Sequence, residues 1–204
     1  MTLSLLLATG NPAKAERLKI VCAGVDIAFR DSSTLDALPS ADETDGTHLG
    51  NAIAKALAWS RECGGTSLAS DGGLVIPGLG AGWESTLTKR ATGDDVSDAE
   101  HARRLLRRMR AFDGARREAY WTEALAVVRD GLLQCAWESD GMSGVIGHEY
   151  RPNLDGPSGF WADGLWETAD GRKRWELTEE ERLIGGDPWA ALGPEVRNLL
   201  ARLD

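Results

Sequence analysis

The stretch Leu7-Ala8-Thr9-Gly10-Asn11-Pro12-Ala13-Lys14 joins a predicted strand to a predicted helix. The apolar run Leu3 to Ala8 is typical of a buried strand. Asn11 suits the N-cap and Pro12 the first helical position, so a helix is predicted up to about Ala23. Free backbone N–H groups at a helix N-terminus bind anions, and Lys14 would add a positive charge. The alternative is an ordinary capped connection, and the spacing is not that of a Walker A loop.

Outward from this stretch, strands and helices first alternate and a group of strands then follows. This order predicts a mixed α/β sheet with flanking helices. The segment 31–46 is polar and acidic and is predicted to be a loop, and 74–93 is predicted to be an ordered, glycine-rich loop region. Further strands are expected at 25–29, 67–69, 118–128, 132–138 and 141–147, and further helices at 47–62, at 97–109 with Ser97 and Glu100 as a capping box, after Thr178 as N-cap, and at 194–203.

Two acidic segments have the residue types of a metal or catalytic site. Glu43 lies in the loop before the 47–62 helix, which carries Asn51 and Lys55, and carboxylate oxygens are ligands that Mg²⁺ prefers. Asp71 follows the short strand 67–69 and is expected to be exposed at the sheet edge, where the adjacent glycines let the backbone approach a ligand. The alternatives are a solvated acidic loop and a plain Asp-Gly turn.

The segment 156–166 is rich in glycine and tryptophan. Phe160 or Trp161 could stack on a base, and Asp163 could accept a hydrogen bond from a base or from a protein donor. The alternative is that these aromatic residues form one edge of the hydrophobic core.

The composition indicates a soluble protein that does not bind nucleic acid. The 204 residues carry a formal net charge of −9, which repels phosphate backbones. The three cysteines are scattered, which indicates reduced thiols and a cytoplasmic location. The N-terminus lacks the basic region of a signal peptide, and no apolar stretch approaches the ~20 residues of a membrane span, so no membrane association is expected.

Five segments, in this order, resemble motifs of the inosine triphosphate pyrophosphatase family, whose members hydrolyse non-canonical purine nucleoside triphosphates such as those of inosine and xanthosine. The family motif T-G-N-x-x-K is present at 9–14, E-T…N-A-x-x-K-A at 43–56, and E-L-T-x-E-E-K at 176–182 with Arg182 in place of lysine. The family's D-D-S-G-L corresponds to 70–74, where Ser70 replaces the first aspartate. G-F-G-Y-D-P corresponds to 159–164.

The resemblance implies one domain, 1–204, with two lobes around a central cleft, usually assembled as a homodimer. It implies a Mg²⁺-dependent hydrolase that converts a nucleoside triphosphate to the monophosphate and pyrophosphate. It also implies roles for individual residues. Asp71 would be the general base, Lys55 would neutralise charge at the scissile phosphate, and Glu43 and Asp71 would face the metal. Phe160 would stack on the base near Asp163. The rest of the substrate would be bound by Thr9, Gly10, Asn11, Lys14, Gly72, Arg182 and either Lys89 or Arg90.

The chain departs from the family where the base is read. The family has Ser-His-Arg after the E-E-K element, whereas this chain has Gly185-Gly186-Asp187-Pro188. Asp187 is an acceptor, which favours an amino group on the base over a carbonyl oxygen. The extra tryptophans Trp161, Trp166 and Trp189 either reshape the pocket or pack in the core. Two alternatives therefore stay open: a Maf-like pyrophosphatase of modified or pyrimidine nucleotides, and a nucleotide-binding module that has lost catalysis.

Overall fold

The structure is a computed structural model that describes residues 2–42, 45–88, 92–93, 96–153 and 160–203. The chain divides into two compact units. Unit 1 comprises 1–72, 123–139 and 188–204, and unit 2 comprises 73–122 and 140–187. The expected single domain with a cleft between two lobes stays a prediction.

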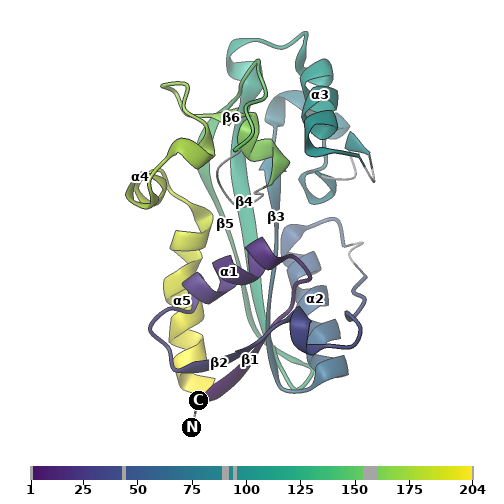
Figure 1. Cartoon of the computed structure of the whole chain (residues 1–204), viewed down its shortest axis with the longest axis vertical. Helices are drawn as coiled ribbons and strands as arrows, with labels where there is room; N and C mark the ends of the chain where they lie inside the picture. The colour runs from purple at the N-terminus through teal and green to yellow at the C-terminus, as the bar shows by residue number, and fades with distance from the viewer. Residues whose placement is uncertain (1, 43–44, 89–91, 94–95, 154–159, 204) are drawn as a thin grey trace. The chain divides into compact units, whose positions relative to one another are not determined.

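A six-stranded mixed sheet has the strand order β2-β1-β3-β4-β5-β6. β1 pairs in parallel with β2 and β3, whereas β5 and β6 are antiparallel. The expected mixed α/β fold is confirmed (Figure 1). The strands are β1 (Leu3–Leu7), β2 (Ile27–Arg30), β3 (Thr66–Val75), β4 (Glu118–Arg129), β5 (Leu132–Ile146) and β6 (Trp166–Glu167).

In unit 1, helices cover both faces of the sheet (Figure 1). On one face, α1 (Pro12–Val21) and α5 (Pro188–Leu203) pack over Leu5 and Leu7, and on the other, α2 (His48–Cys63) packs over Leu6. Successive side chains of a strand point to opposite faces, so burial on both faces explains the uninterrupted apolar sequence of β1.

Unit 2 has its own hydrophobic core beneath α3 (Asp98–Met109), and α4 (Glu179–Ile184) also belongs to this unit. Trp161 and Trp166 are 4% and 1% exposed and belong to this core, while Trp189 is 8% exposed in a core of unit 1. The packing role of these tryptophans is therefore confirmed.

Two strand predictions are wrong. β3 does not end at Ser70 but continues to Val75, so Asp71 lies inside a strand and is only 7% exposed. Hydrogen-bonded partners make this burial of a carboxylate possible. The segments 132–138 and 141–147 form one strand, β5, in which Met142 adopts a positive φ of 50°.

Two helix predictions also need correction. The last helix begins at Pro188 and not at Pro194, which lies inside α5. Packing of Trp189 and Leu192 in the core offsets the hydrogen bond that Pro194 cannot donate. In α3, Ser97 is the N-cap as predicted, but the carboxylate of Glu100 pairs with Arg103 and Arg104.

Candidate functional site

The N-terminus of α1, where the sequence predicts an anion site, is capped by the Asn11 side chain. The Asn11 side chain accepts hydrogen bonds from the backbone N–H groups of Ala13 (2.9 Å) and Lys14 (3.4 Å). The Thr9 hydroxyl in turn accepts one from the Asn11 backbone at 3.1 Å. A Cβ atom at Gly10 would lie 2.7 Å from Leu38 Cδ1, so the turn has no room for a larger residue without movement of Leu38.

A cavity of about 340 Å³ in unit 1 opens at this helix end. It brings together five of the residues predicted to bind phosphate, although they come from two distant segments of the chain. One further lining residue, Ser70, was not predicted to take part. The predicted residues are Thr9, Gly10, Asn11, Lys14 and Lys55.

Asp71 is surrounded by donors from one face of α2. Lys55 Nζ lies 2.7 Å from Asp71 Oδ1, and His48 Nδ1 lies 2.7 Å from Oδ2. Asn51 Nδ2 makes a longer contact of 3.5 Å with Oδ2. The acid is therefore held through both oxygens, and the structure brings Asp71 into contact with Lys55.

These donors determine the protonation of Asp71. Burial by itself raises the pKa of this carboxyl. The His48 hydrogen bond and the charges of Lys55 and Lys14 outweigh burial, so the pKa lies below its ordinary value. Asp71 is therefore ionised at neutral pH.

His48 is a site residue that the sequence analysis missed. A signal for it existed, because His48, Asn51 and Lys55 are spaced by three and four residues and so share one face of a helix. The sequence does not show, however, that this face packs against Asp71, and the spacing of His48 from the other histidines is not that of metal ligands.

One unpartnered oxygen lies on a side chain that contacts Asp71. Asn51 Oδ1 is buried and has no hydrogen-bond partner within the described part of the chain, while Asn51 Nδ2 contacts Asp71. Among the described residues, no three histidine, cysteine, aspartate and glutamate side chains form a group that could hold a metal ion. Carboxylate and amide oxygens are ligands of the kind that Mg²⁺ takes, and this ion obtains its other ligands from water and phosphate.

A second buried acid, Glu123 on β4, lies in unit 1. Its Oε1 has no hydrogen-bond partner among the described residues. Burial raises the pKa of Glu123, while the charges of Lys14 and Arg17 act in the opposite direction. Glu123 was not predicted as a site residue.

In unit 2, a buried arginine joins two acids of the expected base-binding region. Arg174 donates to Asp163 Oδ1 at 3.3 Å and to Asp187 Oδ2 at 2.8 Å. Burial by itself lowers the pKa of Arg174, but the two carboxylates outweigh it, so its pKa lies above the ordinary value. Asp187 was predicted to be an acceptor, and one of its oxygens accepts from Arg174.

The aromatic residues of this region differ in exposure. Phe160 is partly buried and meets Trp121 edge to face, with ring centroids 5.7 Å apart. Trp161 is buried and stacks on His101 at 5.4 Å. Phe160 is therefore better placed than Trp161 to meet a base.

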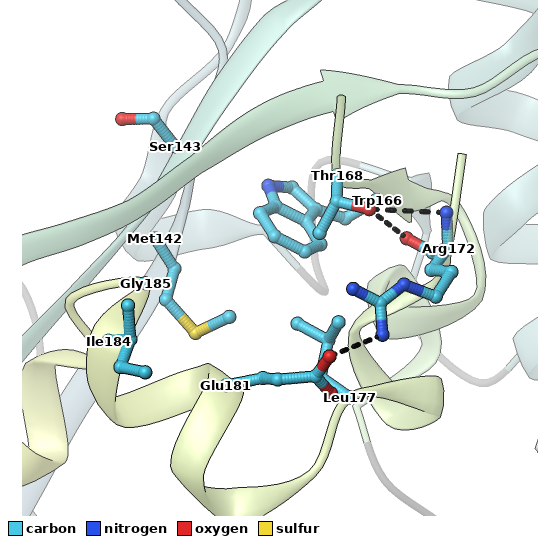
Figure 2. A pocket seen from close by; sticks show the side chains of 9 residues that line it. All are labelled: Met142, Ser143, Trp166, Thr168, Arg172, Leu177, Glu181, Ile184 and Gly185. Carbon is cyan, nitrogen blue, oxygen red and sulfur yellow. Dashed lines mark hydrogen bonds and ion pairs between the residues drawn. The ribbon is translucent and has the colours of Figure 1, made fainter. Parts of the chain in front are cut away.

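A separate cavity of about 240 Å³ in unit 2 lies beside α4. Figure 2 shows the Trp166 ring facing it, with the Arg172–Glu181 ion pair (2.7 Å) beside it. None of the predicted site residues lines this cavity. Arg182 lies in α4, and its backbone oxygen accepts from Asp187 N at 2.9 Å.

Two predicted site residues, Glu43 and Lys89, and the alternative Arg90 lie outside the described residues. Gly72 follows Asp71 within β3. The predictions for these positions stay predictions.

Comparison with known sequences identifies the family. The sequence model of the Ham1 family matches residues 5–182. The chain belongs to the Ham1 family. A dITP/XTP pyrophosphatase of Yersinia pseudotuberculosis is 32% identical over 182 residues, which cover 87% of this chain and 88% of the relative. A dITP/XTP pyrophosphatase of Anaeromyxobacter is 31% identical over 234 residues and covers 98% of each chain.

Solved structures agree with this Ham1 fold. A HAM1 protein from Coxiella burnetii superposes with a TM-score of 0.78 at 24% identity, over 98% of this chain and 99% of that one. A nucleoside-triphosphatase / dITP/XTP pyrophosphatase from Mycobacterium abscessus gives 0.71 at 26% identity, over 97% and 98%. The predicted family and fold class are confirmed.

Within the described ranges, no helix has the length and apolar character needed to cross a membrane.

Proposed function

We propose that this Ham1 protein hydrolyses a non-canonical purine nucleoside triphosphate to the monophosphate and pyrophosphate. The predicted enzyme class, a nucleoside triphosphate pyrophosphatase, is confirmed by relatives named dITP/XTP pyrophosphatase. The observation that carries the proposal is the cavity of unit 1, in which a capped helix N-terminus meets Lys14 and Lys55, the latter paired with the buried Asp71.

The first part of the proposal is that this cavity binds the triphosphate. Backbone N–H groups at the start of α1 carry partial positive charge, and Lys14 and Lys55 carry full charges. Together they offset the repulsion that a net charge of −9 exerts on a polyanion. Thr9, Gly10 and Asn11 would position the phosphate oxygens.

The second part is that Asp71 activates the attacking water. The Asp71 carboxylate would accept a proton as the water oxygen attacks the α-phosphorus, and the bond to the β-phosphate oxygen would break. Lys55 stays beside the negative charge that develops. A general base contributes typically about 10²–10⁴-fold to such a step.

The third part concerns a metal. We propose Mg²⁺ with Glu43 and Asp71 as carboxylate ligands, and the unpartnered Oδ1 of Asn51, a residue that contacts Asp71, supports a cation at this place. When bound, Mg²⁺ would neutralise the charge of the phosphate oxygens. This chain's own contribution is to hold those oxygens in line with Asp71.

The fourth part concerns the base. We propose that Phe160 stacks on it and that Asp163, Asp187 and Arg182 lie around its edge. Asp163 and Asp187 place carboxylate oxygens, which accept hydrogen bonds, on either side of Arg174, and this supports a base that donates hydrogen bonds through an amino group or a ring N–H.

The test is pyrophosphate release from a panel of nucleoside triphosphates with Mg²⁺. We expect release from at least one modified purine nucleotide, and a loss of about 10²-fold or more in Asp71→Asn. Asp36→Asn, an exposed acid in the same unit, is the matched control and should keep full activity.

Other outcomes point to other functions. Preference for pyrimidine or modified pyrimidine nucleotides would favour a Maf-like activity. If no nucleotide in the panel releases pyrophosphate but nucleotides still bind, the result would favour a binding module. A clear preference for inosine or xanthosine triphosphate over amino-bearing bases would reject an amino group as the recognised feature.

A further inference from the structure

One buried side chain at the catalytic centre has no role in the steps proposed above. His48 is 5% exposed, and its Nδ1 lies 2.7 Å from Asp71 Oδ2. It is the first residue of α2, after the N-cap Thr47, whose hydroxyl accepts from Gly50 N. The position of the ring is therefore defined by a capped helix end.

The partners of Asp71 occupy most of its hydrogen-bonding capacity. An ionised carboxylate has about four lone-pair sites on two oxygens. Lys55 takes one on Oδ1, and His48 takes one on Oδ2, which also receives the longer contact from Asn51. The lone-pair site that can still accept a hydrogen bond is therefore mainly on Oδ1, the oxygen next to Lys55.

The two short contacts also fix the plane of the carboxylate. A carboxylate turns readily about its Cβ–Cγ bond unless both oxygens are held, because this torsion has a broad energy profile. His48 and Lys55 hold one oxygen each and lie two helical turns apart on the same face of α2. Without His48, Oδ2 would keep only the longer contact from Asn51.

We propose that His48 is a positioning residue, which holds Oδ2 of Asp71 so that Oδ1 faces the attacking water beside Lys55. This inference rests on the proposed pyrophosphatase activity. His48 touches neither the water nor the phosphate in this arrangement and acts through Asp71. Its contribution belongs to the chemical step more than to substrate binding.

The experiment compares two replacements of His48. His48→Phe keeps a ring of similar size without a donor, and His48→Asn places an amide N–H near the position of Nδ1. We expect His48→Phe to lower kcat by about 10²-fold, as small misplacements of reacting groups do, with KM for the best nucleotide within about threefold. His48→Asn should recover at least about tenfold of the lost kcat.

A structural role would give a different pattern. The thermal unfolding midpoint and the binding of Mn²⁺, followed by its electron paramagnetic resonance signal, are measured for each variant. If His48→Phe fails to fold, His48→Leu replaces it as the donor-free variant. Unchanged kcat in a folded donor-free variant would overturn the proposal, and so would equal losses of kcat in His48→Asn and the donor-free variant.

The outcomes separate this inference from the function on which it rests. An active wild type with an active His48→Phe variant rejects the positioning role and leaves the pyrophosphatase intact. A wild type without pyrophosphate release on any nucleotide rejects both.

Discussion

At the scale of single residues, ionised and buried side chains define the candidate site. Asp71 is buried with three donors around it, whereas Glu123 is buried with one oxygen unpartnered. The pKa of Asp71 is lowered and that of Glu123 is raised. Two acids of the same unit therefore affect stability with opposite dependence on pH.

For Glu123, we expect Glu123→Gln to increase stability at neutral pH. An acid whose folded pKa is raised contributes stability below its unfolded pKa of about 4.3, and this contribution is lost as pH rises through the folded pKa. The gain in the free energy of unfolding should therefore be present at pH 7 and should vanish near pH 4.

Urea unfolding at several pH values measures this effect. Glu118→Gln, at an exposed acid on the same strand, is the control and should show no such dependence. A Glu123→Gln variant that is less stable than wild type at pH 7 would contradict the assignment of Glu123 as a buried acid with a raised pKa.

The Arg174 cluster gives a second prediction at this scale. Arg174→Met removes the cation that bridges the buried Asp187 and the partly buried Asp163. We expect a loss of about 3–5 kcal/mol in the free energy of unfolding. Arg172→Met breaks more exposed pairs with Asp170 and Glu181 and should cost at most about 1 kcal/mol. Similar losses in both variants would contradict this account.

At the scale of elements, the N-terminal caps of two helices differ in what they contribute: one cap stabilises its helix, and the other also borders the candidate site. Asn11 caps α1 beside the cavity, and Ser97 caps α3 in unit 2, where its hydroxyl accepts from Glu100 N at 3.3 Å. Loss of either cap should destabilise the protein by about 1 kcal/mol. Only the end of α1 faces the residues proposed to bind phosphate.

We therefore expect Asn11→Ala and Ser97→Ala to lower the unfolding free energy similarly and to differ in catalysis. Asn11→Ala should also raise KM for the nucleotide several-fold, because it removes a side chain that lines the cavity and is proposed to position the phosphate oxygens. Steady-state kinetics on both variants decide this. An equal KM in the two variants would show that the start of α1 does not take part in nucleotide binding.

At the scale of the whole molecule, we propose a homodimer, as the family resemblance implies. Light scattering after size-exclusion chromatography should give twice the mass of the chain. The mass of a single chain at micromolar concentration would reject the dimer. The mutational predictions above apply within one unit of one chain and do not depend on this result.

The sequence by itself determined the fold class, the family and much of the proposed phosphate site. Thr9, Asn11 and Lys14 belong to one turn and one helix start, where local rules for caps and anion binding apply. The helices that begin after Thr47, Ser97 and Thr178 were likewise predicted, because their capping residues act within a few positions of the chain.

The tertiary structure alone decided which distant residues meet. Sequence reasoning ended β3 at Ser70, because a carboxylate beside two glycines is typical of an exposed turn. Only the packing of α2 against β3 supplies His48, Asn51 and Lys55 as partners that allow Asp71 to be buried. The start of α5 and the role of Arg174 could not be predicted from the sequence for the same reason. Contacts between residues far apart in the chain outweigh local propensity.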